Sequence, residues 1–168
     1  MGGPALASEH QVAVGAATLT TSDFLRPHTG RTAVGLTYGY RTERWLLGGG
    51  VRFAFPRDTA VLPWELHARA LLVARMGVWA PALGPELGLT GLAVLSSTTW
   101  AKGLPDDFAR QQARLLGPVY FSIHSAPLRF EFSRFTVSAF ELQVGANLPP
   151  LGATLRLQLD YINVGVRL

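Results

Sequence analysis

A two-residue alternation runs through Trp64–Met76, where the chain reads WELHARALLVARM. Apolar side chains occupy one set of alternate positions, and the other set includes Glu65, His67, Arg69 and Arg75. Successive side chains of a β-strand point to opposite faces, so the pattern predicts a strand with one apolar and one polar face. Strands usually run about five or six residues, whereas a tilted strand needs about 9–11 residues to cross a bilayer. The segment therefore has the length and the patterning of a membrane-spanning strand.

The composition agrees with a membrane barrel built from strands. Apolar residues make up 48% of the 168-residue chain and charged residues 15%, and the mean hydropathy is +0.22. No stretch approaches the roughly 18 uninterrupted apolar residues that a spanning helix needs. Apolar content without a long apolar run is typical of membrane β-barrels, in which every second residue can be polar. The 18 glycines and 11 prolines favour turns and close strand packing over helices.

Several kinds of site and partner are not expected. The chain has no cysteine, which excludes disulfides and thiolate metal sites. The net charge of +4 comes almost entirely from scattered arginines, because Lys102 is the only lysine. Since these charges form no basic block, we expect no nucleic-acid partner. We also expect no cofactor.

The alternation recurs along the chain and predicts an all-β fold: an antiparallel, up-and-down transmembrane barrel of about eight strands. Residues 10–168 would form this single domain, after a flexible segment at residues 1–9. Connections are long after the first, third and fifth predicted strands and shorter after the second, fourth and sixth, as expected when the two barrel ends face different compartments. The predicted strands are His10–Thr20, Thr32–Arg41, Trp45–Phe55, Trp64–Met76, Glu86–Thr98 and three that begin near Val119, Phe135 and Ala153.

The apolar alternation changes phase in two places. In the last strand it passes from Leu155–Tyr161 to the opposite set at Ile162, and a similar slip occurs near Phe140. A β-bulge resets the phase by one residue. A soluble sandwich with a two-sided apolar core would give the same pattern, so the sequence leaves both explanations open.

The strand ends carry aromatic residues. Four tryptophans fall at predicted strand ends: Trp45, Trp64, Trp79 and Trp100. Indole rings favour the headgroup level of a membrane, where the apolar ring and the polar N–H are both satisfied. We therefore interpret these residues as interface aromatics.

With alternating strands, alternating loop lengths and aromatic strand ends, the chain resembles the small eight-stranded outer-membrane barrels of Gram-negative bacteria. Ile162, Val164 and Val166 supply the apolar alternation typical of the family's last strand, although residue 168 is leucine where the family usually has an aromatic. The resemblance implies an outer-membrane location and contact with membrane lipids. Members of the family serve in adhesion, structural support or lipid modification, so the fold alone does not select a role.

The polar strand faces predict a plugged lumen. Glu65, His67 and Arg69 share one face and could form an acid–base group or part of a metal site. However, the interior of an eight-stranded barrel is just wide enough for side chains to fill, and buried charges must be paired. The network interpretation is therefore preferred, with these members: Arg52, Glu65, His67, Arg69, Arg75, Glu141, Gln143, Arg156, Gln158 and Asp160.

No catalytic or metal site is expected. His124 and Ser125 are adjacent, so on a strand they point to opposite faces and cannot exchange a proton directly. The four histidines, His10, His28, His67 and His124, show no ligand spacing. An outer-membrane lipid hydrolase is therefore only a remote alternative to a non-enzymatic barrel. A second alternative is a soluble or periplasmic lipocalin-like barrel holding an apolar ligand, which requires apolar side chains inside and charged ones in solvent.

The remaining candidate for function is the longest predicted connection, at about residues 99–118. Asp106, Gly117 and Pro118 are placed as the capping and stop residues of a short helix. Such a helix could present an apolar face to a protein partner or fold back over the barrel mouth. The candidate partner-binding residues are Trp100, Lys102, Phe108, Leu115 and Leu116.

Overall fold

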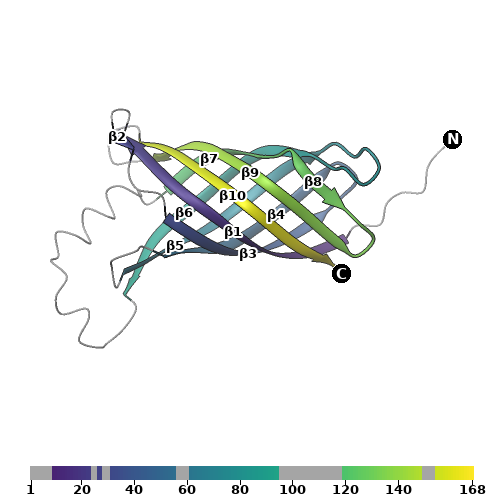
Figure 1. Ribbon diagram of the computed structural model, residues 1–168, viewed down its shortest axis with the longest axis horizontal. Helices are drawn as coiled ribbons and strands as arrows, with labels where there is room; N and C mark the ends of the chain where they lie inside the picture. Colours follow the sequence, from purple (N-terminus) through teal and green to yellow (C-terminus); the bar gives the residue numbers. More distant parts are fainter. Residues whose placement is uncertain (1–8, 24–25, 28–30, 56–60, 95–118, 149–153) are drawn as a thin grey trace.

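The computed structural model describes residues 9–23, 26–27, 31–55, 61–94, 119–148 and 154–168, which form a closed antiparallel sheet (Figure 1). The closed, eight-stranded antiparallel barrel confirms the predicted all-β barrel architecture. The long strands are β1 (Glu9–Asp23), β3 (Arg31–Arg41), β4 (Trp45–Phe55), β5 (Val61–Val73), β6 (Ala82–Val94), β7 (Val119–Ala126) with its continuation β8 (Leu128–Glu131), β9 (Phe135–Leu148) and β10 (Thr154–Arg167). The two-residue β2 (Arg26–Pro27) pairs with the end of β1.

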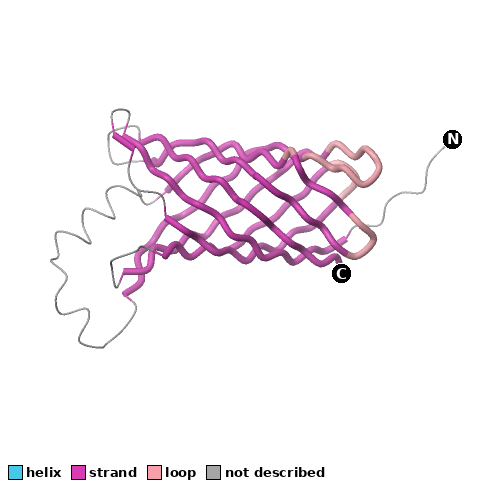
Figure 2. The backbone as a smooth tube through the Cα atoms, in the orientation of Figure 1, coloured by secondary structure: helices cyan, strands magenta, loops and turns pink. Residues whose placement is uncertain are grey.

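Each long strand pairs with its neighbours along the chain, and β10 closes the barrel by pairing with both β9 and β1. The strands are inclined to the barrel axis, as closure of a sheet requires (Figure 2). β1 begins and β10 ends at the same end of the barrel, where Gln11 pairs with Arg167. The three short turns after β3, β5 and β8 lie at this end, which we call the hairpin end.

Two predictions concern segments that lie wholly or mostly outside the described residues. The loop helix predicted within 99–118 lies outside the described residues. So do residues 1–8 of the predicted flexible segment, whereas Glu9 already belongs to β1. No helix in the described ranges is long and apolar enough to cross a membrane.

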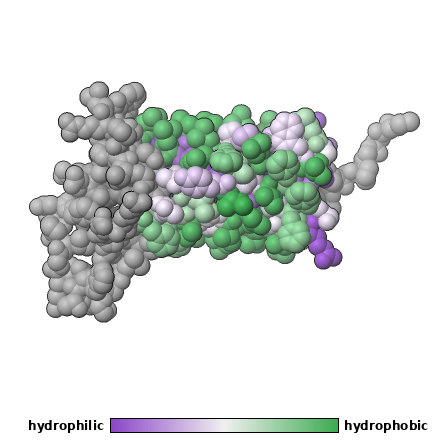
Figure 3. Space-filling model, in the orientation of Figure 1, coloured by the Kyte–Doolittle hydropathy of each residue, from purple (hydrophilic) through white to green (hydrophobic). Residues whose placement is uncertain are grey.

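The outer wall of the barrel is apolar, as Figure 3 shows for one side. Leu66 and Leu72 of β5 are 52% and 51% exposed, whereas Glu65 and His67 between them are each 3% exposed and face the interior. A lipocalin-like barrel requires the opposite arrangement, with apolar side chains inside. The facing of β5 therefore contradicts that alternative and fits a barrel surrounded by lipid.

The predicted boundaries of the fourth and fifth strands, β5 and β6 of the structure, are wrong at the turn that connects them. β6 begins at Ala82, four residues before the predicted start at Glu86, and β5 ends at Val73 and not at Met76. The connecting turn is tighter than expected, because Met76 and Trp79 pair directly. Gly84 and Pro85 suggested a turn, yet both lie within β6, where a side chain on Gly84 would collide with the Ala70 carbonyl of β5.

Both predicted phase slips are irregularities of the sheet, and they lie side by side. Asp160 pairs with Ala17 and Ile162 with Ala16, so Tyr161 is an extra residue of β10 relative to β1. The register of β9 and β10 places Phe140 opposite Tyr161, and Phe140 has a φ of 54°. Phe140 and Tyr161 both point outward, 56% and 47% exposed. The bulge explanation is therefore correct, and the two-sided core is not.

The facing of β5 generates a stability prediction. Leu66→Arg would place a charge on the lipid-facing wall near the middle of a spanning strand, which costs about 2–4 kcal/mol at the bilayer midplane. We expect the free energy of unfolding in lipid vesicles, measured by denaturant titration, to fall by this amount. Met76→Arg, in the turn after β5, is the matched control and should cost less than about 1 kcal/mol. Equal losses for the two variants would contradict the expectation that Leu66 lies deeper in the membrane than Met76.

Candidate functional site: the polar interior of the barrel

The structure gathers nearly all the predicted lumen residues inside the barrel. The buried members are Arg52, Glu65, His67, Arg69, Glu141, Gln143, Arg156, Gln158 and Asp160, none more than 8% exposed. The prediction is wrong for Arg75, whose side chain is exposed. β5 ends at Val73, so the alternating sequence pattern extends beyond the strand into the turn that contains Arg75. The interior is thus built by strands on several sides of the barrel.

Two arginines form forked ion pairs across the interior. Arg52 of β4 donates to both carboxylate oxygens of Glu86 on β6, at 2.8 and 3.1 Å. Arg156 of β10 does the same to Glu65 of β5, with both distances at 2.6 Å. Two parallel N–H···O bonds fix the planes of both groups, so these are the strongest and most directional contacts of the interior.

Tyr120 of β7 connects the two ion pairs. Its hydroxyl donates to Glu86 Oε1 at 2.9 Å, and its ring lies 3.8 Å from the guanidinium carbon of Arg156. Arg52 Nη1 also lies 3.5 Å from Glu65 Oε2, which joins the pairs directly. Gly88 of β6 is required here, because a Cβ at that position would overlap the Tyr120 ring.

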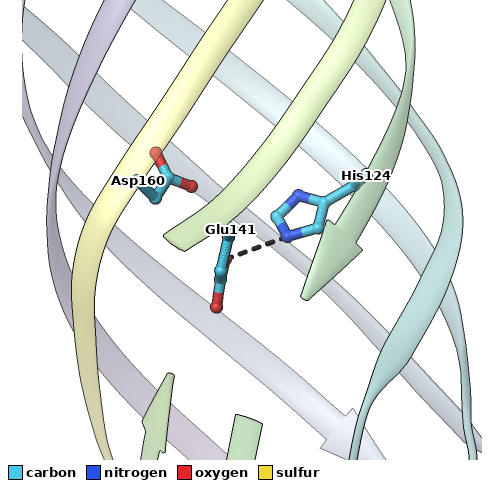
Figure 4. Close-up of side chains that lie close together, drawn as sticks. All are labelled: His124, Glu141 and Asp160. Carbon is cyan, nitrogen blue, oxygen red and sulfur yellow. Dashed lines mark ion pairs between the residues drawn. The ribbon is translucent and has the colours of Figure 1, made fainter. Parts of the chain in front are cut away.

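A third group surrounds His124 of β7, which is fully buried. Its Nδ1 lies 3.3 Å from Glu86 Oε2, and its Nε2 lies 2.9 Å from Glu141 Oε2 (Figure 4). Ser138 donates to the other oxygen of Glu141, and Arg69 Nη1 lies 3.8 Å from Glu141 Oε2. Both nitrogens of the imidazole thus face carboxylates from two other strands.

Asp160 of β10 completes this part of the interior. Its Oδ1 accepts a hydrogen bond from Gln158 Nε2 at 2.7 Å. A cavity of about 20 Å³ lies beside it, lined by Gly15, Ala17, Gly35, Thr37, Arg52, Asp160 and Asn163. This volume is enough for about one water molecule. The small residues of β1 and β3 thus line a water-sized space together with Arg52 of β4 and with Asp160 and Asn163 of β10.

The hairpin end of the interior has its own contacts. Glu131 of β8 pairs with Arg41 at 3.2 Å and with Arg129 at 2.9 Å, and Arg129 also donates to Gln11. A small apolar cluster lies at the same end: Leu46, Leu71, Val73, Ala80, Ala82 and Ala126. Side chains therefore fill the barrel toward the hairpins as well as at its centre.

Sequence reasoning missed several interior residues. Glu86, Tyr120, Ser122 and His124 are all at most 1% exposed. The same alternation could have identified them, since Tyr120, Ser122 and His124 alternate with outward Phe121 and Ile123. Glu86 is the first residue of the predicted strand Glu86–Thr98, but the predicted lumen network did not include it.

The four tryptophans predicted as interface aromatics differ in their positions along the chain and the barrel. Trp45 and Trp79 lie at the hairpin end, 46% and 40% exposed, and the Trp79 indole donates to the Pro127 carbonyl at 2.7 Å. Trp64 is partly exposed and lies within β5, because that strand begins at Val61. Trp100 lies outside the described residues, as do the loop candidates Lys102, Phe108, Leu115 and Leu116.

The histidine–serine pair does not form a hydrolase site. His124 points into the barrel with both ring nitrogens beside carboxylates, and the neighbouring Ser125 pairs with Leu142 on the outward face. A lipid substrate outside the barrel could not reach the buried imidazole. The geometry gives no support to the lipid-hydrolase alternative.

A closed, eight-stranded barrel with an apolar outer wall and a charged interior is the fold of the small outer-membrane barrels. Solved structures agree with this class. The chain is similar to Neisserial surface protein A, with a TM-score of 0.67 at 12% identity over 95% of this chain and 97% of that one.

Two further solved barrels are similar in fold. The N-terminal β-barrel domain of Pseudomonas aeruginosa OprF matches with a TM-score of 0.56 at 13% identity, covering 96% of this chain and 99% of that chain. Ail, the attachment invasion locus protein of Yersinia pestis, matches with a TM-score of 0.51 at 13% identity over the same shares. No family model matches the sequence, and no curated protein is significantly similar to it. These similarities concern the fold, and the resemblance inferred from the sequence is thereby confirmed.

The ion pairs generate a prediction on stability. Replacing Glu65 by Gln leaves the buried Arg156 charge without its partner, and breaking one side of such a pair costs about 3–5 kcal/mol. Arg156→Met should cost a similar amount, whereas the Glu65→Gln, Arg156→Met double variant should lose clearly less than the sum. Denaturant unfolding in detergent measures the cycle, with Glu43→Gln on the exposed hairpin as control. Strict additivity would show that the two side chains are not coupled.

Proposed function

We propose that this protein is an integral outer-membrane β-barrel with a structural, scaffolding or loop-mediated binding role and a lumen plugged by polar side chains. The observation that carries the proposal is the interior network, which joins β4, β5, β6, β7, β9 and β10 through buried side chains. The outer-membrane location is supported by the apolar outer wall and by the fold of the three similar barrels.

The plug follows from the size of the barrel and from its contents. An eight-stranded barrel leaves an interior just wide enough for side chains. Here the forked pairs Arg52–Glu86 and Arg156–Glu65 cross that interior, and the cavity beside Arg52 has room for about one water molecule. An open ionic path would require several of these charged contacts to break together.

A conductance measurement tests the plug. Purified protein inserted into planar bilayers should show no large, steady conductance, because the paired side chains leave no continuous aqueous path. A parallel sample must show heat-dependent mobility on detergent gels, which establishes that the barrel is folded. Large, steady currents from folded protein would mean that the lumen is open and the proposal wrong.

Binding, in this proposal, belongs to the barrel end opposite the hairpins. The connections between β1 and β3, β4 and β5, β6 and β7, and β9 and β10 all start and finish there. Functional residues are disproportionately found on such loops, held by a rigid scaffold. The segment 95–118 is the longest, and its proposed partner-binding residues are Trp100, Lys102, Phe108, Leu115 and Leu116. Among the similar barrels, Ail was solved in complex with the heparin analogue sucrose octasulfate, so a barrel of this fold can carry a ligand.

Deletion of residues 102–114 tests the location of binding. The barrel should remain folded, because the deleted residues lie between β6 and β7 and outside both strands. Capture of a protein partner in a crosslinking pull-down from the native membrane should be lost. The matched control replaces residues 102–114 by a Gly/Ser sequence of equal length, which keeps the connection but removes its side chains. An unchanged set of crosslinked proteins in both variants would contradict the proposal.

A further inference from the structure

We propose that His124, Glu141 and Asp160 form a zinc site inside the barrel. The three residues come from the adjacent strands β7, β9 and β10, and all three are buried. One ligand atom from each lies within 4.8 Å of the others (Figure 4). An imidazole nitrogen and two carboxylate oxygens are ligands that Zn²⁺ accepts in proteins.

The first argument is the contact between His124 and Glu141. His124 Nε2 lies 2.9 Å from Glu141 Oε2, and neither atom has a hydrogen-bond partner among the described residues. The other ring nitrogen, Nδ1, faces Glu86 Oε2 and can donate its hydrogen there. In that neutral tautomer Nε2 carries a lone pair that points at a carboxylate oxygen. The contact therefore needs either a hydrogen on Nε2 or a metal ion bound by both atoms.

The second argument is the isolation of Asp160. This carboxylate is 7% exposed, and none of the ion pairs formed within the described ranges includes it. Glu65, Glu86, Glu131 and Glu141 each have an arginine within ion-pair distance. Arg52 lines the same cavity as Asp160 but forms its ion pairs with Glu65 and Glu86. A buried carboxylate without a direct ion pair is costly, so a cation beside Asp160 and Glu141 would lower that cost.

The third argument is the available space. The water-sized cavity of the interior is lined by Asp160 and also by Asn163, whose Oδ1 has no hydrogen-bond partner within the described part of the chain. A catalytic or partly open zinc site keeps a position for water beside its protein ligands. Of the three proposed ligands Asp160 lines this cavity, so the cavity offers room for a water beside Asp160.

The sheet irregularity explains how these side chains meet. Ser138 and Glu141 both face inward although they are three residues apart, because Phe140 at positive φ resets the phase of β9. The neighbouring bulge at Tyr161 resets β10 after Asp160, and Glu141 pairs directly with Asp160. Bulges of this kind re-aim side chains and are frequent beside functional sites.

The ligand set selects among metals. Ca²⁺ takes six to eight oxygen ligands, and Mg²⁺ demands octahedral geometry and retains several waters. A dry interior with a nitrogen ligand and room for about one water fits neither ion. The two carboxylates balance the charge of a divalent ion, and Arg69, 3.8 Å from Glu141 Oε2, remains the only arginine paired with these ligands among the described ion pairs.

Metal binding by the folded barrel tests the proposal. The protein is refolded in detergent after chelator treatment, with Zn²⁺ or Co²⁺ present, and separated from free metal by gel filtration. We expect one bound Zn²⁺ per chain by elemental analysis, visible absorption from bound Co²⁺, and an imidazole contribution in zinc X-ray absorption. Absence of stoichiometric metal in folded protein would overturn the site.

Variants distinguish this site from other metal binding. His124→Gln and Asp160→Asn should each weaken Zn²⁺ affinity at least about 100-fold, since even the loss of supporting groups around metal ligands costs 10–100-fold. His67→Gln is the matched control, because His67 is also a buried interior histidine but lies outside the three-residue set, and this variant should bind zinc as the parent does. Heat-dependent gel mobility must show that each variant is folded.

The competing explanation is a proton shared between His124 and the two glutamates. It predicts that nitrogen NMR detects a hydrogen on both ring nitrogens of His124, unchanged by excess Zn²⁺ during refolding. That result would overturn the zinc site. Loss of the Nε2 hydrogen upon loading with zinc, absent in Asp160→Asn, would support it.

Discussion

The central constraint on this structure is that the charges of the barrel must be satisfied by one another. Lipid around an apolar wall offers no partners for a charge, and an eight-stranded lumen is too narrow for bulk water. Arginines and carboxylates from different strands therefore meet in defined pairs, with Arg52–Glu86 and Arg156–Glu65 at the centre. Because removal of one member leaves a buried charge, these contacts fix the relative positions of strands that are not neighbours in the sheet.

Much of this fold follows from the sequence, because a side-chain period of two is a local property of a strand. The alternation around Trp64 was enough to indicate which residues of β5 face lipid and which face the lumen. It failed where local signals conflicted: Gly84 and Pro85 indicated a turn, although the sheet accommodates both within β6. It also extended β5 too far, so Arg75 was assigned to the lumen although it lies in a turn.

The candidate site shows what local patterns cannot supply. His124, Glu141 and Asp160 are separated by 17 and 19 positions in the sequence and have no ligand spacing along the chain. They come together through the register of three strands and through two bulges, and register depends on contacts between distant segments. The phase slips near Phe140 and Tyr161 were visible in the sequence, but their alignment across β9 and β10 was not.

That alignment also determines how the barrel can close. β9 and β10 keep the same register on both sides of Phe140 and Tyr161, whereas β1 meets β10 with one residue fewer. The pairing of β1 with β10 is therefore where β10 has one residue more than its partner strand. If β10 continued past Tyr161 in strict alternation, with no bulge, Ile162, Val164 and Val166 would turn into the lumen and Asn163 toward lipid. The bulge, in which Tyr161 and Ile162 both face outward, thus lets the two ends of the chain pair with their apolar and polar faces matched.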